Sequence, residues 1–344
     1  MILAGGVGSR FWPVSTAQRP KQLLPLGEGP SLIGDTVERI LPLVGRERLR
    51  ILTGESLARA LLAELPGMTS DQLLIEPVAR GTAPVLAWAA HTLLRTDPDA
   101  VMASLHSDHV IKPAEVFRRQ MAKTAELART ERRLVTIGVQ PTRPETGYGY
   151  IRAGQRLESD VIEAYEVGKF VEKPRRETAS DYVRQGYLWN TGIFVWPAAL
   201  FLEELRRTAP QVGDHLPLLD EGRVADFFAQ TPTLSVDEGV LEKSDRVAVV
   251  AAEFEWDDVG AWDAVGRVRH ADAEGNVSVG NVSLVDAKDC IAWADEGAIV
   301  VFGAEDLVVV RTGNVTLVAA RDRTAELKSL LKQLPRNLRE PPME

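Results

Sequence analysis

The chain has 344 residues, of which 45% are hydrophobic and 26% are charged. This composition is typical of a globular protein, and the length predicts about two domains. Its 40 basic and 49 acidic side chains give a net charge of −9, which excludes sequence-independent binding to nucleic acid as the main function. A single cysteine, Cys290, excludes an internal disulfide, and no run approaches the about 18 apolar residues of a membrane helix. We expect a cytoplasmic protein, large enough to be an enzyme, that binds neither nucleic acid nor membrane and whose anion sites are local.

Short apolar runs alternate with helical patterns in the first part of the chain. The predicted strands are 2–4, 49–52, 72–75, 100–105 and 134–139, and the predicted helices lie near 31–41, 55–65, 82–95 and 114–130. This alternation is typical of βαβ units around a mostly parallel sheet, which binds ligands beyond the carboxyl ends of its strands. Only four residues precede the first glycines. We therefore expect either a short first strand or a true start upstream of Met1.

The later part of the chain changes character. Residues 146–260 mix strands with helices less regularly, with predicted strands at 164–171, 191–196 and 247–254. Beyond residue 268 come short β-rich pieces and one helical stretch at 324–334, so we predict an α/β domain over residues 1–268 and a second domain over 269–344. In the second domain, apolar residues or glycines recur every six positions, which indicates hexapeptide β-helix rungs. They are Val279, Val285, Ile291, Gly297, Gly303, Val309 and Val315.

A glycine-rich loop follows the first strand in the segment Leu3–Arg10, and a basic segment, Arg19–Gln22, comes soon after it. Glycines at a strand end permit positive φ, so that successive amide groups can point at a phosphate chain. Arg10 and Lys21 would supply the positive charge. The spacing matches neither the dinucleotide fingerprint nor the P-loop. The alternative is a glycine-rich turn beside two solvated cations.

Ser107-Asp108-His109 closes the strand that ends near residue 105. A carboxylate at the carboxyl end of a sheet strand is where a protein would hold Mg²⁺ against a substrate phosphate. The alternative is that Ser107 and Asp108 cap a helix. His106 and His109 have no Cys or His partner at ligand spacing, so we expect both to be structural.

Two adjacent carboxylates, Asp257 and Asp258, stand between an apolar strand and a helix. Mg²⁺ usually takes one or two carboxylates together with phosphate oxygens and water, so this pair can supply a second ligand beside Asp108. The alternative is that both aspartates cap the following helix, with Trp256 and Trp262 in the core.

Three further segments combine glycines with groups that recognise sugars: Gly147–Tyr150, Phe170–Pro174 and Trp189–Gly192. Within them, Glu172 and Asn190 suit sugar hydroxyls, and Lys173 suits a phosphate. Hairpin turns and an edge-strand ion pair are the alternative interpretation.

Taken together and in this order, the motifs resemble those of the sugar-1-phosphate nucleotidyltransferases. The matching segments are LAGGVGSRFWPVS with RPKQLLPL (3–26), EPVARGTAP (76–84), SDHVI (107–111), ETGYGYI (145–151), KFVEKP (169–174), WNTGIFVW (189–196), SVDEGVLEKSD (235–245), WDDVGAWDAV (256–265) and the C-terminal stretch from GNVSLVDAKDC to AEDLVVVRTGNVTLVAARD. RPKQ and EPVARGTAP are similar to the guanylyltransferase branch that uses mannose 1-phosphate. The resemblance implies a Rossmann-like domain with a mixed, mostly parallel sheet, then a small left-handed β-helix domain with a C-terminal helix, and homodimerisation through the β-helix.

The resemblance also implies a reaction, the transfer of GMP from GTP to mannose 1-phosphate with Mg²⁺ as cofactor. The catalytic residues would be Arg10, Lys21, Asp108 and Asp258, of which Asp108 and Asp258 would hold the metal. The nucleotide would be bound by Leu3, Gly5, Gly6, Gly8, Ser9, Arg10, Lys21, Glu76, Arg80 and Thr82. Mannose 1-phosphate would be bound by Gly149, Glu172, Lys173 and Asn190.

Two other functions stay open at this point. One is the same reaction with another base or sugar phosphate, because single hydrogen bonds in the pocket decide that choice. The other is a non-catalytic homologue that binds GDP-mannose as a regulator. Asp257 stands where the family tends to have a small residue, which leaves open which carboxylate of the pair binds the metal, and we expect Asp258.

Overall fold

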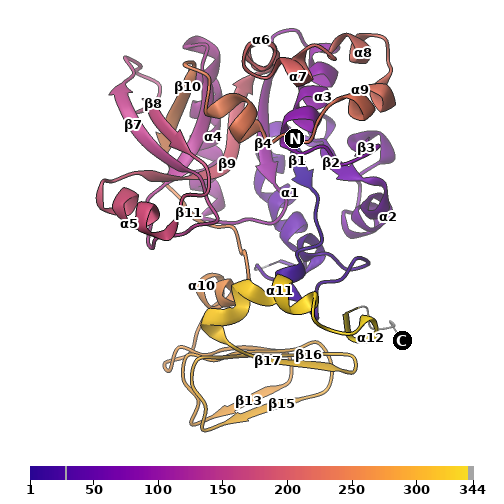
Figure 1. Cartoon of the computed structure of the whole chain (residues 1–344), viewed down its shortest axis with the longest axis vertical. Helices are drawn as coiled ribbons and strands as arrows, with labels where there is room; N and C mark the ends of the chain where they lie inside the picture. Colours follow the sequence, from indigo (N-terminus) through magenta and orange to yellow (C-terminus); the bar gives the residue numbers. More distant parts are fainter. Residues whose placement is uncertain (28, 340–344) are drawn as a thin grey trace.

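The computed structural model describes residues 1–27 and 29–339. Two modules lie one above the other in Figure 1, a large α/β domain and, below it, a β-helix formed by the C-terminal part of the chain. Helix α11 (Leu327–Leu331) lies between them. Among the described residues, no helix combines the length and the apolar character needed to cross a membrane.

The α/β domain is organised around a nine-stranded sheet in the order β3-β2-β1-β4-β9-β6-β10-β8-β7. All of these strands except β8 and β9 run in the same direction, which confirms the predicted mixed, mostly parallel sheet. The strands are β1 (Ile2–Ala4), β2 (Ile51–Gly54), β3 (Leu73–Glu76), β4 (Val101–His106), β6 (Leu134–Val139), β7 (Tyr150–Arg156), β8 (Tyr165–Val171), β9 (Leu188–Pro197) and β10 (Val247–Ala251).

Helices cover both faces of this sheet with their apolar sides. One face packs against α1 (Leu32–Val44), α2 (Glu55–Glu64) and α4 (Ala114–Thr130). The other packs against α3 (Thr82–Leu94), α6 (Ala198–Thr208), α7 (Pro210–Gly213), α8 (Pro217–Asp220) and α9 (Val224–Gln230). Two further helices are α5 (Arg176–Arg184), which packs beside β7, and α10 (Val265–Val268).

The carboxyl ends of β1 and β4 lie side by side, because these strands are parallel neighbours with Leu3 opposite His106. The glycine loop after β1 and Asp108 after β4 therefore leave the sheet at the same edge. A small ribbon brings a third segment to this place. In it, β5 (Val110–Lys112) pairs antiparallel with β11 (Glu255–Asp257), so that Asp257 lies opposite Val110. Asp258 follows directly, and the ribbon thereby carries it to the segment that holds Asp108.

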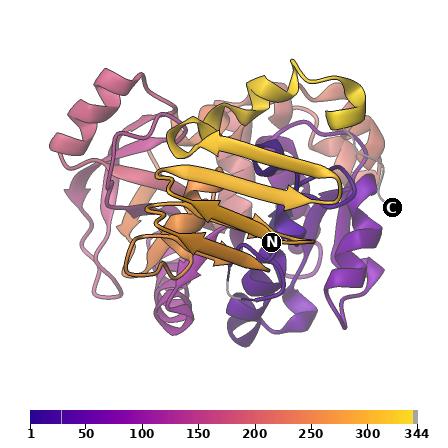
Figure 2. The same ribbon diagram turned by 90° about the horizontal axis from the view of Figure 1, so that it is seen from below.

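The C-terminal module is a β-helix of two stacked sheets, which confirms the predicted β-helix domain. Figure 2 shows its strands lying across the underside of the α/β domain. One sheet contains β12 (Val277–Val279), β14 (Ile291–Ala294), β16 (Leu307–Thr312) and β17 (Val315–Ala320), and the other contains β13 (Val282–Val285) and β15 (Ile299–Phe302). The parallel pairs β14–β16 and β13–β15 are offset by 17 residues, as in Ile291 with Val308 and Val282 with Ile299, and the pair β12–β14 by 14, as in Val277 with Ile291. After β17 the chain forms η7 (Arg321–Glu326), α11 and α12 (Arg336–Arg339), and residues 340–344 of the predicted second domain lie outside the described residues.

The prediction that this module repeats every six residues is wrong, because the residues at that spacing do not share one side of the β-helix. Val285 is 46% exposed, whereas Ile291, in the next slot, is fully buried. Gly297 and Gly303 occupy turns with φ of 67° and 63° instead of interior positions. The physical reason is that side chains alternate between the two faces of a strand with a period of two residues. Any even spacing of apolar residues in a β-rich segment therefore resembles a structural repeat.

The two modules share one hydrophobic cluster. Phe11 and Trp262 of the α/β domain pack with Trp293 of the β-helix and Leu327 of α11. Trp262 also donates from Nε1 to the carbonyl oxygen of Trp12 at 3.0 Å. The modules are therefore held together by a common core, and a domain boundary after residue 268 stays a prediction.

Candidate functional site

The glycine loop is shaped around Lys21. Gly6 and Gly8 have φ of 81° and 72°, a left-handed conformation that glycine adopts without strain. A Cβ on Gly8 would lie 2.3 Å from the Cβ of Lys21, so only glycine fits there. The backbone N–H of Lys21 donates to the carbonyl oxygen of Val7 at 3.0 Å, which fixes the basic segment against the loop.

Lys21 joins the two predicted metal ligands. Its Nζ lies 2.8 Å from Oδ2 of Asp108 and 2.6 Å from the carbonyl oxygen of Asp258, and its side chain is only 8% exposed. These three residues, together with Gly8 and Arg10, line a cavity of about 410 Å³, which we call the phosphate cavity. The structure thus brings together the predicted catalytic residues from three separate segments of the sequence.

The carboxylates of Asp108 and Asp258 offer oxygen ligands for a cation in this cavity. Burial alone would raise the pKa of Asp108, but the Lys21 ammonium, supported by two neighbouring histidines, outweighs it and holds that pKa below its ordinary range. Burial raises the pKa of Asp258 despite the opposing effect of Lys21. Lys21 contacts the carboxylate of Asp108 but only the backbone carbonyl oxygen of Asp258. Because a hard cation prefers oxygen ligands, the residues present fit Mg²⁺.

Asp257 faces a different partner from Asp258. Its Oδ2 lies 2.7 Å from Nε of Arg267, and its Oδ1 accepts from the backbone N–H of Val259, also at 2.7 Å. Val259 has a φ of 48°, so this contact stabilises an uncommon backbone conformation. Asp258 lines the phosphate cavity, whereas Asp257 is committed to the turn and to Arg267. That Asp258 is the metal ligand stays a prediction.

Two histidines, His106 and His109, lie close to Asp108. Ligand atoms of His106, Asp108 and His109 all lie within 4.8 Å of one another. Burial lowers the pKa of both histidines, and Nδ1 of His109 accepts from Nε1 of Trp256 at 3.1 Å. Sequence reasoning assigned both histidines a structural role, which stays a prediction, and it did not place them beside Asp108.

The residues predicted to bind the sugar phosphate also converge. We call Gly149, Glu172, Lys173 and Asn190 the Asn190 cluster. A Cβ on Gly149 would lie 2.7 Å from Oε2 of Glu172 and 3.3 Å from Cβ of Asn190, so the glycine permits their close approach. Lys173 forms an ion pair with Glu172. The cluster therefore presents amide, carboxylate and ammonium groups together, as recognition of a sugar phosphate requires.

Asp237 belongs to this site but was not singled out from the sequence. Nδ2 of Asn190 donates to its Oδ1 at 2.9 Å, while Oδ1 of Asn190 accepts from Oγ1 of Thr136 at 2.8 Å. Burial, reinforced by the charge of Glu172, raises the pKa of Asp237 to about 7. Its place in the segment 235–245 was the available signal, but no role followed from that segment alone.

The raised pKa of Asp237 predicts a pH-dependent stability. Between pH 3.8 and about 7, the folded state holds a proton that the unfolded chain has lost. The free energy of unfolding should therefore fall by about 4 kcal/mol as pH rises through this window, and Asp237→Asn should remove that slope. Urea denaturation of both proteins from pH 4 to pH 8 measures it. Glu238→Gln, at the exposed neighbouring acid, should keep the wild-type slope, and parallel profiles for wild type and Asp237→Asn would contradict the assignment.

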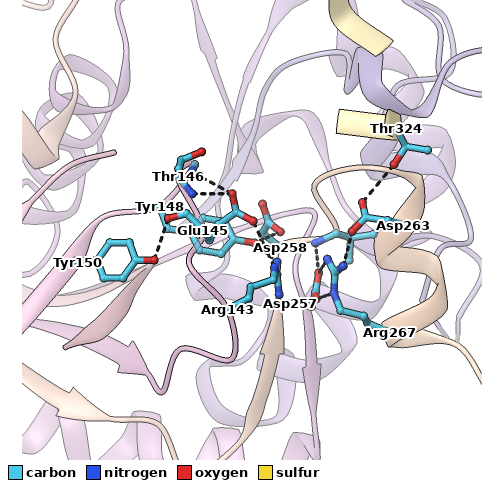
Figure 3. A network of polar contacts seen from close by, with 12 residues as sticks. Arg143, Glu145, Thr146, Tyr148, Tyr150, Asp257, Asp258, Asp263, Arg267 and Thr324 are labelled. Atoms are coloured by element: carbon cyan, nitrogen blue, oxygen red, sulfur yellow. Dashed lines mark hydrogen bonds and ion pairs between the residues drawn. The ribbon is translucent and has the colours of Figure 1, made fainter. Parts of the chain in front are cut away.

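Tyr148 connects the two halves of the site. Its hydroxyl donates to Oδ1 of Asp258, as Figure 3 shows. A second cavity, of about 870 Å³, runs from Tyr148 and Lys173 past Asp258 to Arg321 in the C-terminal module. Figure 3 also shows Arg267 between Asp257 and Asp263, and Asp263 next to Thr324 of η7. The C-terminal module thus borders the site directly.

Comparisons with known proteins agree with this geometry. A family model described as nucleotidyl transferase matches residues 1–275, and one described as a mannose-P isomerase/GMP-like β-helix domain matches residues 280–334. The chain belongs to the nucleotidyl transferase family. This confirms the family predicted from the motifs.

Several similar proteins carry names that describe an activity or a pathway. A mannose-1-phosphate guanylyltransferase of Klebsiella pneumoniae is 36% identical over 98% of this chain and 74% of that relative. The xanthan biosynthesis protein XanB of Xanthomonas campestris pv. campestris is 38% identical over 97% of this chain and 72% of XanB. A solved structure described as mannose-1-phosphate geranyltransferase from Thermus thermophilus has a TM-score of 0.88 at 36% identity, covering 96% of this chain and 97% of that one.

The residues predicted for the nucleoside have partners inside this nucleotidyltransferase. Nε of Arg80 donates to the carbonyl oxygen of Phe228 at 2.9 Å, and Oγ1 of Thr82 accepts from the backbone N–H of Val236 at 2.8 Å. Glu76 ends β3 half-buried, and burial raises its pKa. These two hydrogen bonds hold the segment with Arg80 and Thr82 against α9 and against the start of the π-helix at Asp237–Leu241. A role of Glu76, Arg80 and Thr82 toward the base stays a prediction.

Proposed function

We propose that this nucleotidyltransferase transfers GMP from GTP to mannose 1-phosphate and releases pyrophosphate. The observation that carries the proposal is the position of Lys21, whose ammonium contacts Asp108 and Asp258 where the glycine loop leaves the sheet. This arrangement gives one location for phosphates, a cation and a basic side chain. The named relatives support guanine and mannose as the base and the sugar.

The proposed reaction needs no protein nucleophile. A phosphate oxygen of mannose 1-phosphate attacks the α-phosphorus of GTP, a new P–O bond forms, and the bond from the α-phosphorus to the bridging oxygen of pyrophosphate breaks. The attacking group is already an anion near neutral pH, so the chain must position two anions and neutralise their charge. Arg10 and Lys21 would do so for the triphosphate and Lys173 for the sugar phosphate.

Asp108 and Asp258 would hold Mg²⁺ in this proposal. When bound, the ion would polarise the phosphoryl oxygens of the triphosphate and neutralise charge that develops on them. The Asn190 cluster would fix the sugar, since Glu172 and Asn190 offer an acceptor and a donor to its hydroxyls. Tyr148, which contacts Asp258, would keep that carboxylate oriented.

The direct experiment measures pyrophosphate released by the purified protein with GTP, mannose 1-phosphate and Mg²⁺. ATP, UTP, CTP or dTTP in place of GTP, and glucose 1-phosphate in place of mannose 1-phosphate, test the base and the sugar. We expect rapid release with GTP and mannose 1-phosphate. Faster release with another pair would replace the substrates and keep the chemistry, while tight binding of GDP-mannose without release would indicate a regulator. A cytoplasmic location, where GTP is available, is part of the proposal.

We also propose that two copies associate through the β-helix. Val300 and Phe302 of β15 are each 73% exposed, and Val285 of β13, opposite Phe302, is 46% exposed. Contiguous exposed apolar groups of this kind mark interaction sites. If a second copy covers this face, its exposed apolar side chains no longer favour aggregation.

The dimer predicts a change in mass after one substitution. Phe302→Asp places a charge in the proposed interface and should convert the dimer into a monomer in analytical ultracentrifugation. Val318→Asp is the matched control, because Val318 is 61% exposed on β17 of the other sheet and should leave the dimer intact. A monomeric wild type, or a Phe302→Asp variant that stays dimeric, would rule out this interface.

A further inference from the structure

One side chain of the C-terminal module enters the phosphate cavity. Lys328 lies on α11, at the far end of the sequence from the glycine loop, yet it lines the same cavity as Arg10 and Lys21. None of the motifs considered from the sequence includes it. The question is whether this is a chance approach or a built part of the site.

Packing fixes the backbone of Lys328 beside this cavity, while its side chain is exposed. The preceding residue, Leu327, is only 3% exposed and packs in the shared cluster with Phe11, the residue after Arg10. Helix α11 contacts η1 (Ser9–Phe11), the turn that ends the glycine loop. Leu327 and Phe11 therefore act as an anchor, and the residues beside them, Lys328 and Arg10, are held at one cavity.

The three cationic side chains of this cavity differ in whether they have a partner. Lys21 already contacts Asp108 and Asp258 through its ammonium. By contrast, within residues 1–27 and 29–339, neither Arg10 nor Lys328 forms a side-chain hydrogen bond or ion pair. Both side chains are exposed and free to contact an anion, and a polyphosphate carries enough negative charge to contact both.

We infer that Lys328 binds the pyrophosphate part of the nucleotide, so that the β-helix module supplies a cation to the reaction. This inference rests on the proposed function for the identity of the nucleotide. Lys328 would contact the β- and γ-phosphates of the bound triphosphate, and the pyrophosphate that leaves. The sugar phosphate would not need Lys328. Lys173 lines the larger cavity together with Tyr148, and the rest of the Asn190 cluster lies next to Gly149.

The distinguishing measurement is the reverse reaction, in which GDP-mannose and pyrophosphate give GTP and mannose 1-phosphate. Lys328→Ala should raise KM for pyrophosphate about tenfold, since a charged contact to phosphate is lost. KM for GDP-mannose should stay within about twofold, and Lys328→Arg should restore most of the affinity for pyrophosphate. Lys332→Ala, a lysine at the end of α11 that does not line the phosphate cavity, is the matched control and should resemble the wild type.

Calorimetric titration of the protein with inorganic pyrophosphate and Mg²⁺ separates this inference from the proposed function. Weaker binding by Lys328→Ala than by Lys332→Ala supports the inference even if the wild type turns over a different nucleotide. Equal pyrophosphate affinity and equal KM in the two variants would overturn it while leaving the proposed reaction intact. A rise in KM for both GDP-mannose and pyrophosphate in Lys328→Ala would also overturn it, because that outcome indicates a general distortion of the site.

Discussion

Asp258→Asn is expected to lower kcat by about two to three orders of magnitude with little change in the fold. The substitution keeps the size of the side chain and its contact with Tyr148 but removes the negative charge that Mg²⁺ needs. Loss of one preorganised electrostatic contact to a reaction of this kind typically costs about 10²–10³ in rate. Steady-state rates of pyrophosphate release over a range of Mg²⁺ concentrations measure the effect, and thermal unfolding shows whether the fold is kept.

Asp257→Asn is the matched comparison, because it removes the adjacent carboxylate. Asp257 is paired with Arg267 and accepts from the backbone of Val259, so its loss should cost about 1 kcal/mol of stability and leave kcat within a few-fold of the wild type. If Asp258→Asn kept a near-normal rate with Mg²⁺ while Asp257→Asn lost it, the metal would belong to Asp257 instead.

Gly8→Ala is expected to reduce kcat/KM by about a hundredfold or more. The new Cβ would meet the Cβ of Lys21 at 2.3 Å, on a backbone with a φ of 72°. Lys21 must then move, and with it the ammonium that contacts Asp108. A displacement of about 1 Å in a positioning group can cost about 10² in rate.

A control separates this displacement from the cost of the backbone conformation. Gly222 has a φ of 74°, almost that of Gly8, but a Cβ there would meet nothing within 4 Å. Gly222→Ala should therefore lose about 1 kcal/mol of stability through backbone strain alone and keep its activity. Equal losses of activity in the two variants, or full activity of Gly8→Ala, would show that the contact with Lys21 does not matter.

The elements of the α/β domain were largely predictable from the sequence. The predicted strands 2–4 and 134–139 and the predicted helix 114–130 have the observed bounds, and the other early elements differ by a few residues at their ends. Local signals suffice here, because apolar periodicity separates strands from helices. The six-residue period in the β-helix failed for the opposite reason, since it relied on spacing without knowledge of which side of each strand faces inward.

The sequence alone also determined the chemistry available to the protein. Glycines after the first strand, basic residues beside them and carboxylates at strand ends were compatible with a phosphate and metal site, with turns and helix caps as the alternative. The order of the motifs indicated the family and, through it, the site. Only the tertiary structure decided how these groups meet. The pairing of β5 with β11 brings Asp258 to Asp108, the fold of the sheet places Asp237 against Asn190, and the shared core with Phe11 carries Lys328 to the phosphate cavity. Such contacts join residues far apart in the chain, and their formation depends on packing between elements, which no local pattern records.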